Sequence, residues 1–172
     1  ILPANIDLTG AEIELVNAVG RETVLRNALM NFLKEEPFDF VLFDCPPSLG
    51  LLSLNALAAS REVFIPLQTE FFALQGMTRL MEVVDLIRDR LGFTIDITGI
   101  NPTMYDTRTN LSHEVDNEIR KYFGDKVFKN IIQSNIKLAE APSHGQSIFE
   151  YATGSRGATD FERLAKEILK RS

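Results

Sequence analysis

The sequence predicts an α/β protein in which a mostly parallel sheet is flanked by helices, with residues 1–172 forming a single domain. Helical and strand patterns alternate along the chain, their connections are short, and polar residues follow the apolar strand segments. Of the 172 residues, 45% are hydrophobic and 24% are charged. This balance is typical of a globular protein with a substantial core, and it excludes disordered and fibrous classes.

The first half of the chain carries three predicted helices. In residues 9–20, Thr9 and Glu12 have the spacing of a capping box at the start of a helix. Residues 21–36 place their apolar side chains on one stripe, which indicates an amphipathic helix. Residues 50–59 are small and apolar enough for a buried helix.

The second half carries longer amphipathic helices. One is predicted over residues 72–91, and another over 110–123 with Asn110 as its N-cap. The helix over 110–123 is expected to turn four side chains inward: Leu111, Val115, Ile119 and Tyr122. The last helix is expected to turn Phe161, Leu164 and Ile168 toward the sheet.

Four apolar segments predict strands, at residues 38–43, 63–65, 94–100 and 127–132. Two residues after the first of them comes Cys45, which is expected to be a small buried residue. In parallel sheets, ligands bind at the carboxyl ends of the strands. Polar residues directly after these segments are therefore the candidates for function.

Several classes of protein are excluded by what the sequence lacks. No apolar run reaches the roughly 20 residues that cross a bilayer, and the first residues lack the basic and apolar regions of a signal peptide. A single cysteine excludes an intrachain disulfide and metal sites built from several cysteines, and two histidines leave little for a histidine site. We expect a cytoplasmic protein with no stable membrane association.

Charge is distributed unevenly along the chain. Residues 1–119 hold 8 Lys and Arg against 18 Asp and Glu, whereas residues 120–172 hold 10 against 6. An acidic body with a basic end can contact a polyanion, but surface helices rich in Lys and Arg give the same pattern. Charge alone does not separate these two interpretations.

Asp44 is the first candidate for chemistry, because it directly follows an apolar strand segment and precedes two prolines. A carboxylate in that place can hold Mg²⁺ through water beside the phosphates of a nucleotide. The alternative is a carboxylate that caps the following turn. The glycine-rich phosphate-binding pattern G-x-x-x-x-G-K-[ST] does not occur in the chain.

Two further segments are candidates for binding. Residues 101–109 form a polar loop after the third predicted strand, where a softly packing methionine could contact a base. The alternative is an ordinary loop between a strand and a helix. Residues 135–145 predict a short helix and a turn, with His144 in solvent.

Four motifs in series resemble the ParA/Soj chromosome- and plasmid-partitioning ATPases, which belong to the deviant-Walker class together with MinD. They are FDFVLFDCPPS at 38–48, LNAL at 54–57, TMYD at 103–106 followed by Arg108-Thr109, and LAEAPS at 138–143. Their order and spacing match over the whole chain. The resemblance implies a fold like that of P-loop NTPases.

The resemblance also implies ATP and Mg²⁺ as cofactors. It assigns Asp44 to the catalytic site, where it positions Mg²⁺ through water, and it assigns adenine contacts to Thr103, Met104, Gln133 and Ser134. Members of the family form ATP-dependent homodimers and bind DNA without sequence preference. A ParB-like centromere-binding partner stimulates their ATPase, and the protein is expected to associate with the nucleoid.

The chain departs from the family pattern in two respects. The family's deviant Walker A lysine and switch-I aspartate are expected upstream of position 1, so the chain resembles the C-terminal two-thirds of such a protein and is expected to be inactive alone. Where the family usually has Ile-Pro-Arg-Asn, residues 132–135 read Ile-Gln-Ser-Asn. That weakens the implied adenine contact and removes a basic residue that could face DNA.

The basic end of the chain is the predicted DNA-binding face. Five residues are assigned to it: Lys137, Arg156, Arg163, Lys166 and Lys170. The alternative is an ordinary solvated helix face. Two other functions remain open at this point, a MinD-like membrane-cycling ATPase and a non-catalytic interaction module of the same fold.

Overall fold

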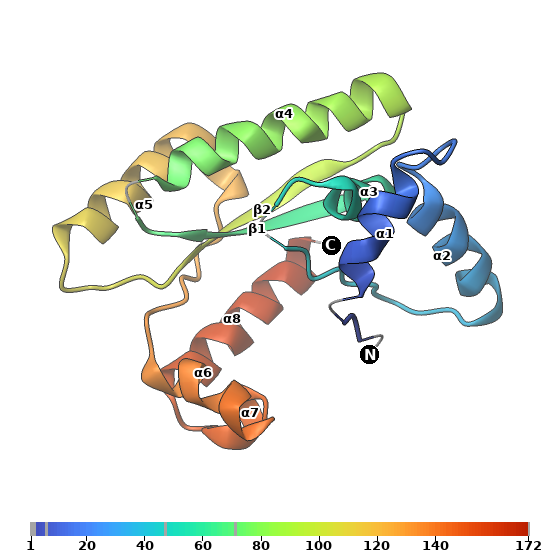
Figure 1. Cartoon of the computed structure of the whole chain (residues 1–172). Helices are drawn as coiled ribbons and strands as arrows, with labels where there is room; N and C mark the ends of the chain where they lie inside the picture. Colours follow the sequence, from blue (N-terminus) through green and yellow to red (C-terminus); the bar gives the residue numbers. More distant parts are fainter. Residues whose placement is uncertain (1–2, 6, 47, 71, 172) are drawn as a thin grey trace. The chain divides into compact units, whose positions relative to one another are not determined.

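Helices and strands alternate between α3 and α5 in the computed structural model (Figure 1). The structure describes residues 3–5, 7–46, 48–70 and 72–171. Contacts divide the chain into two compact units, Ile1–Val63 with Thr78–Asp96 and Phe64–Met77 with Ile97–Ser172. The elements are, in chain order, α1 (Leu8–Leu15), α2 (Val24–Glu35), α3 (Leu51–Ala59), β1 (Glu62–Gln68), α4 (Ala73–Leu91), β2 (Asp96–Thr103), α5 (Asn110–Phe123), the 3₁₀ turn η1 (Gly124–Lys126), α6 (Ile136–Glu140), the 3₁₀ turn η2 (Ala141–His144), α7 (Ile148–Tyr151) and α8 (Arg156–Arg171).

In the first unit, the buried side chain of Asn55 joins α3 to the start of α2. Its Nδ2 donates to the carbonyl oxygens of Arg21 at 2.7 Å and Leu51 at 2.9 Å. Its Oδ1 accepts from the Leu25 amide at 3.1 Å. That amide lies in the first turn of α2, where backbone N–H groups have no partner inside the helix. One side chain therefore satisfies the start of α2 and fixes it against α3.

The predicted capping box of the first helix is wrong. The helix α1 begins at Leu8, so Thr9 lies inside its first turn, and no side chain caps it. Glu12 instead reaches the start of α3, where its Oε1 lies 3.4 Å from the Leu52 amide nitrogen. The Glu12 carboxylate, which the sequence pattern assigned to the start of its own helix, thus accepts at the start of α3, 40 residues further along the chain.

The strand predicted over residues 38–43 is also wrong, because no described residue pairs with this segment in a sheet. Phe38, Phe40 and Leu42 are 60%, 58% and 84% exposed. An apolar pattern is not sufficient for a strand, since the amides and carbonyls need a neighbouring strand to pair with. Cys45, which was expected to be buried, is exposed for the same reason.

The strands β1 and β2, most of whose residues belong to the second unit, lie side by side (Figure 1). The Asp96 amide donates to the Arg61 carbonyl near one end of the pair, and the Thr69 amide donates to the Thr103 carbonyl near the other. Because the residue numbers rise together, the strands are parallel, and α4 provides the crossover that parallel strands need. The predicted parallel sheet flanked by helices is confirmed.

The fourth predicted strand, over residues 127–132, lies beside β2 without forming a regular ladder. Parallel bridges join Ile100 to Val127 and Tyr105 to Gln133. Between them, the carbonyl of the buried Pro102 accepts from the Ile132 amide at 3.0 Å. Proline has no amide hydrogen to donate in return, so the pairing is interrupted at this point.

The helices of the second unit bury fewer side chains than predicted. In α5, Val115 and Ile119 are buried, whereas Leu111 and Tyr122 are 43% and 68% exposed. In α8, Leu164 packs in a core cluster with residues of the 127–132 segment, while the expected core residue Phe161 is 41% exposed. Ile168 packs against the same cluster, as predicted, so on α8 only Phe161 departs from the expected inward face.

A pair of charged residues fastens the C-terminal end of α8. The Glu167 carboxylate accepts from the amides of Lys129 at 2.9 Å and Asn130 at 3.0 Å, and from Asn130 Nδ2 at 2.6 Å. The Arg171 guanidinium donates to Glu167 at 2.9 Å and lies 4.3 Å from the centre of the Phe128 ring. These contacts hold α8 against the segment that runs beside β2.

Candidate functional site

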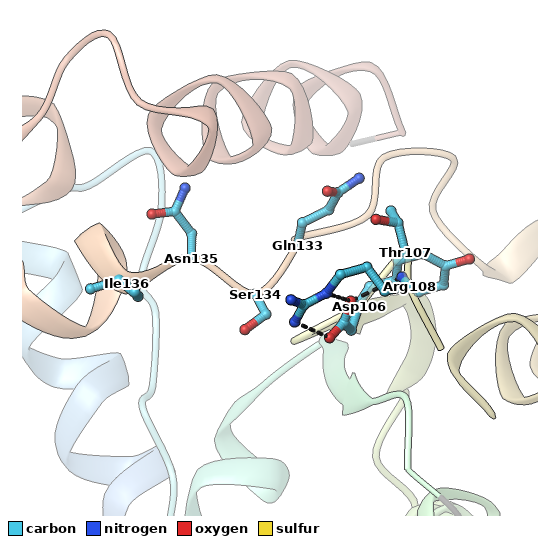
Figure 2. Close-up of a pocket in the computed structure, with 8 residues that line it drawn as sticks. Asp106, Thr107, Arg108, Gln133, Ser134, Asn135 and Ile136 are labelled. Atoms are coloured by element: carbon cyan, nitrogen blue, oxygen red, sulfur yellow. Dashed lines mark hydrogen bonds and ion pairs between the residues drawn. The ribbon is translucent and has the colours of Figure 1, made fainter. Parts of the chain in front are cut away.

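An open pocket of about 500 Å³ lies in the second unit, beyond the carboxyl end of β2. One wall, residues 105–108, follows β2, and the other, residues 133–136, precedes and begins α6. Figure 2 shows the side chains of both walls, with Arg108 beside Asp106. The residues that line the pocket are Tyr105, Asp106, Thr107, Arg108, Gln133, Ser134, Asn135 and Ile136.

Backbone hydrogen bonds hold the two walls together. The Tyr105 amide donates to the Ile132 carbonyl at 3.1 Å, and the Ser134 amide donates to the Tyr105 carbonyl at 3.0 Å. From α8, the buried Asp160 accepts from the Gln133 amide at 3.3 Å. The pocket is therefore positioned by the sheet on one side and by α8 on the other.

The first wall is shaped by a turn that Asp106 makes with Arg108. Asp106 Oδ1 accepts from the Arg108 amide and from its Nε, both at 2.9 Å, and Oδ2 accepts from Nη2 at 2.7 Å. The side-chain hydrogen bonds from Arg108 are the main cause that lowers the pKa of the Asp106 carboxyl to about 2. Asp106 therefore stays charged at neutral pH.

We expect Asp106 to titrate near pH 2, well below its ordinary value of 3.8. Because its pKa is lowered by folding, the ion pair with Arg108 is fully present above pH 3.8 and is lost as the pH falls toward 2. Side-chain carboxyl chemical shifts followed by NMR across this range measure it. Arg108→Gln should move the pKa back toward 3.8, and a normal pKa in the unmodified protein would contradict the geometry.

The structure brings together only some of the predicted base-contacting residues. Gln133 and Ser134 line the pocket. Thr103 ends β2, and Met104 follows it with its side chain 56% exposed; neither is among the lining residues. The φ of Met104 is 51°, in the left-handed region that a non-glycine residue rarely adopts, and it turns the chain from the strand into the pocket wall.

Sequence reasoning named the loop 101–109 as a candidate for binding but singled out Thr103 and Met104 within it, rather than the lining residues Tyr105, Asp106 and Arg108. A signal was available, since an aspartate two residues before an arginine can accept from its amide and its guanidinium at once. Asn135 begins the other candidate segment, residues 135–145, and its side chain caps α6 by accepting from the Lys137 amide at 2.8 Å.

Asp44 lies in the first unit, at the end of the unpaired segment that was expected to form a strand. It is exposed, and it has no hydrogen bond or ion pair with any residue that the structure describes. In the described part of the chain, no group of three or more His, Cys, Asp or Glu side chains is placed to hold a metal ion. A single carboxylate with free oxygens fits Mg²⁺ held mainly by water and phosphate.

Four of the five residues predicted to contact DNA share the exposed side of α8. Arg156, Arg163 and Lys170 are spaced seven residues apart, which places them in one stripe, and Lys166 lies beside it. We call these four residues the α8 stripe. Its opposite side is buried at Gly157, Ala158, Asp160 and Leu164.

Ion pairs occupy some of the predicted DNA-binding cations. Lys166 Nζ lies 2.5 Å from Glu162, and Lys137, away from the α8 stripe on α6, lies 2.8 Å from Glu140. The side chains of Arg156, Arg163 and Lys170 have no ion pair with a described residue. Among the five predicted residues, these three are the most available to an anionic partner.

Comparison with known proteins places the chain in a family. A family model described as an AAA domain matches residues 1–97. A chromosome-partitioning ATPase, Soj of Treponema pallidum, is 51% identical over 170 residues, which cover 99% of this chain and 66% of that protein. The chromosome partitioning protein ParA of Myxococcus xanthus is 46% identical over 171 residues, or 99% of this chain and 60% of that protein. The chain belongs to the ParA/Soj family. It spans about two thirds or less of the length of these relatives.

The fold is shared with a solved nucleotide-bound protein. Cobyrinic acid a,c-diamide synthase of Mycobacterium smegmatis, crystallised with an ATP analogue and magnesium, superimposes with a TM-score of 0.78 at 32% identity. The match covers 98% of this chain and 61% of that one. None of the helices in the described residues is both long and apolar enough to cross a membrane.

Proposed function

We propose that the protein is a partition ATPase and that the pocket beside β2 receives the adenine base of ATP. The observation that carries this proposal is the position of the pocket, beyond the carboxyl end of a parallel strand in a ParA/Soj family chain. Its volume of about 500 Å³ lies in the range of small-molecule sites. Gln133 offers a side-chain amide, which can pair with the N6 and N7 edge of adenine.

Asp44 is the residue proposed to position Mg²⁺ through water. Its exposure and its lack of hydrogen bonds to described residues leave both oxygens available, which disfavours the turn-capping alternative. Magnesium, when bound, neutralises charge on the transferred phosphoryl group. Asp44 would orient the magnesium ion through water and would place a negative charge next to it.

The α8 stripe is proposed as the DNA-binding face, with Lys137 as a further contact. Three of its cations are not paired with described carboxylates, and a homodimer would present the stripe twice. Contacts made by such side chains go to phosphates and carry no sequence preference.

A ParB-like centromere-binding protein is the proposed partner that stimulates hydrolysis, and the cytoplasmic nucleoid is the proposed location.

Steady-state phosphate release tests this function directly. The protein to use is a chain extended to the length of the relatives, called here the full-length protein. We expect it to hydrolyse ATP only with Mg²⁺ present. The 172-residue chain is the control and is expected to be inactive, because it contains no G-x-x-x-x-G-K-[ST] sequence. Equal release with and without Mg²⁺ would contradict the proposal.

Reversing charge in the α8 stripe should weaken DNA binding without regard to sequence. In the full-length protein with an ATP analogue, Lys166→Glu with Lys170→Glu should reduce affinity about tenfold or more and lower the salt slope by about 2. Fluorescence anisotropy with two unrelated duplexes at several salt concentrations measures both quantities.

The matched control for this pair is Arg79→Glu with Arg90→Glu on α4, which changes net charge equally at exposed positions of another helix. If the α4 variant loses as much affinity as the α8 variant, net charge alone governs binding. If neither variant changes affinity or slope, the DNA-binding face is elsewhere.

A further inference from the structure

One histidine outside the pocket contacts two of the residues that line it. The Nδ1 of His113, on α5, lies 2.6 Å from the hydroxyl oxygen of Tyr105. The two rings meet edge to face, with centroids 5.4 Å apart. The other ring nitrogen, Nε2, lies 3.4 Å from the carbonyl oxygen of Thr107. The imidazole therefore bridges Tyr105 and Thr107 in the wall formed by residues 105–108.

The partners of the imidazole determine its protonation. The Thr107 carbonyl can only accept a hydrogen bond, so Nε2 must carry the hydrogen. In the tautomer with hydrogen on Nε2 alone, Nδ1 is an acceptor, and the Tyr105 hydroxyl can donate to it. Tyr105 is 7% exposed, and burial is the first cause that raises its pKa, followed by the charge of Asp116. The phenol therefore stays protonated, and an imidazole with its hydrogen on Nε2 satisfies both partners at once.

The residue before His113 anchors the same wall independently. Ser112 Oγ accepts from the Asp106 amide at 3.3 Å and lies 3.2 Å from Thr69 Oγ1 beyond β1. The backbone at Asp106 is thus held through Ser112, whereas the Tyr105 ring and the Thr107 carbonyl are held through His113. Loss of His113 would leave the wall attached but would release these two groups.

We propose that His113 is a positioning residue that sets the base selectivity of the pocket through Tyr105 and Thr107. This rests on the proposed function, because the ligand concerned is the base of a nucleotide. While His113 holds it, the Thr107 carbonyl is directed to the imidazole. Once released, the carbonyl can turn toward the pocket and add an acceptor. Guanine presents N1–H and N2 donors that such an acceptor would favour, so selectivity for adenine over guanine should fall.

The contact itself can be observed by NMR. Long-range ¹H–¹⁵N spectra of the full-length protein should show the hydrogen of the His113 imidazole on Nε2 and a hydrogen-bonded Nδ1 without hydrogen. Tyr105→Phe should remove the hydrogen-bond shift at Nδ1 without unfolding the protein, because the ring is retained. A tautomer with hydrogen on Nδ1 would overturn the proposal.

The functional test is a double-mutant cycle in the full-length protein, read by calorimetric titration with non-hydrolysable analogues of ATP and GTP. We expect Tyr105→Phe and His113→Leu each to weaken ATP-analogue binding about threefold to tenfold. His113→Leu, which also releases the Thr107 carbonyl, should lower the ATP-to-GTP affinity ratio. The double variant should lose no more than either single one, because the two side chains act as one unit. His113→Asn, which keeps an acceptor for the Tyr105 hydroxyl, should restore part of the affinity.

Glu114→Gln is the control, since Glu114 is an exposed neighbour on α5 with no contact to the pocket wall. It should bind both analogues as the unmodified protein does. Additive losses, or an unchanged affinity ratio in His113→Leu, would overturn the positioning role while leaving nucleotide binding established. Absence of binding by the unmodified protein would overturn the proposed function itself, and with it the role of His113.

Discussion

Replacing Asp44 by alanine should reduce ATP hydrolysis by the full-length protein about 100- to 1,000-fold. The expected loss is large because removing a group that organises charge around the reacting phosphate removes transition-state stabilisation. Folding should be almost unaffected, with a change within about 0.5 kcal/mol, because Asp44 is exposed and contacts no described side chain through a hydrogen bond. Phosphate release and thermal denaturation, measured on the same preparations, separate the two effects.

Asp39→Ala is the matched control for this prediction. Asp39 lies five residues earlier in the same unpaired segment and is also exposed. It should retain activity as well as stability. If Asp44→Ala instead lowers thermal stability strongly while activity per folded molecule persists, the carboxylate caps the following turn and has no part in hydrolysis.

Glu167→Ala should lower the free energy of unfolding of the full-length protein by about 2–4 kcal/mol. The variant leaves the amides of Lys129 and Asn130 without an acceptor and leaves the Arg171 guanidinium without its carboxylate. The Glu167 side chain is only 14% exposed, so water replaces these contacts poorly. Urea denaturation measures the difference.

Glu162→Ala tests whether the stability lost in Glu167→Ala comes from the buried environment of the carboxylate or from the ion pair alone. Both glutamates lie on α8 and pair with a cation four residues later, but the Glu162 and Lys166 side chains are 57% and 67% exposed. Exposed ion pairs contribute about 0–1 kcal/mol, so Glu162→Ala should hardly change the free energy of unfolding. Similar losses of unfolding free energy in Glu162→Ala and Glu167→Ala would contradict the role of the Glu167 contacts in holding α8.

The effect of Glu167 should also depend on pH in a defined direction. Partial burial would raise the pKa of its carboxyl, but the hydrogen bonds from Lys129, Asn130 and Arg171 outweigh it and lower the pKa below 4.5. A lowered pKa means that the stabilisation is fully present above pH 4.5 and is lost as the pH falls through the folded-state pKa. The difference between the unmodified protein and Glu167→Ala should therefore shrink in acid.

Local patterns in the sequence predicted the helices better than the strands. The helices over residues 50–59, 72–91 and 110–123 form almost as expected, since the apolar periodicity lies within each segment. The predicted N-cap Asn110 is wrong, because Thr109 caps that helix by accepting from the Ser112 amide. Strands need partners elsewhere in the chain. The segment 38–43 has an apolar strand pattern but pairs with no described residue, and the ladder over 127–132 is interrupted at Pro102.

The contacts that position the candidate site lie too far apart in sequence for any local pattern to reveal them. Asp160 reaches the amide of Gln133 across 27 residues, and Glu167 reaches Asn130 across 37. Motif order was sufficient to find the family and to place Gln133 and Ser134 at a pocket. It did not indicate that a histidine on the following helix would hold the opposite wall.

The central claim, that the pocket beside β2 receives the base of ATP, is tested most directly by photolabelling. The full-length protein would be irradiated with 8-azido-ATP and Mg²⁺, with and without excess ATP, and the labelled peptides identified by mass spectrometry. The account predicts label within residues 105–108 or 133–136 that excess ATP removes. Competable label confined to other segments would contradict it.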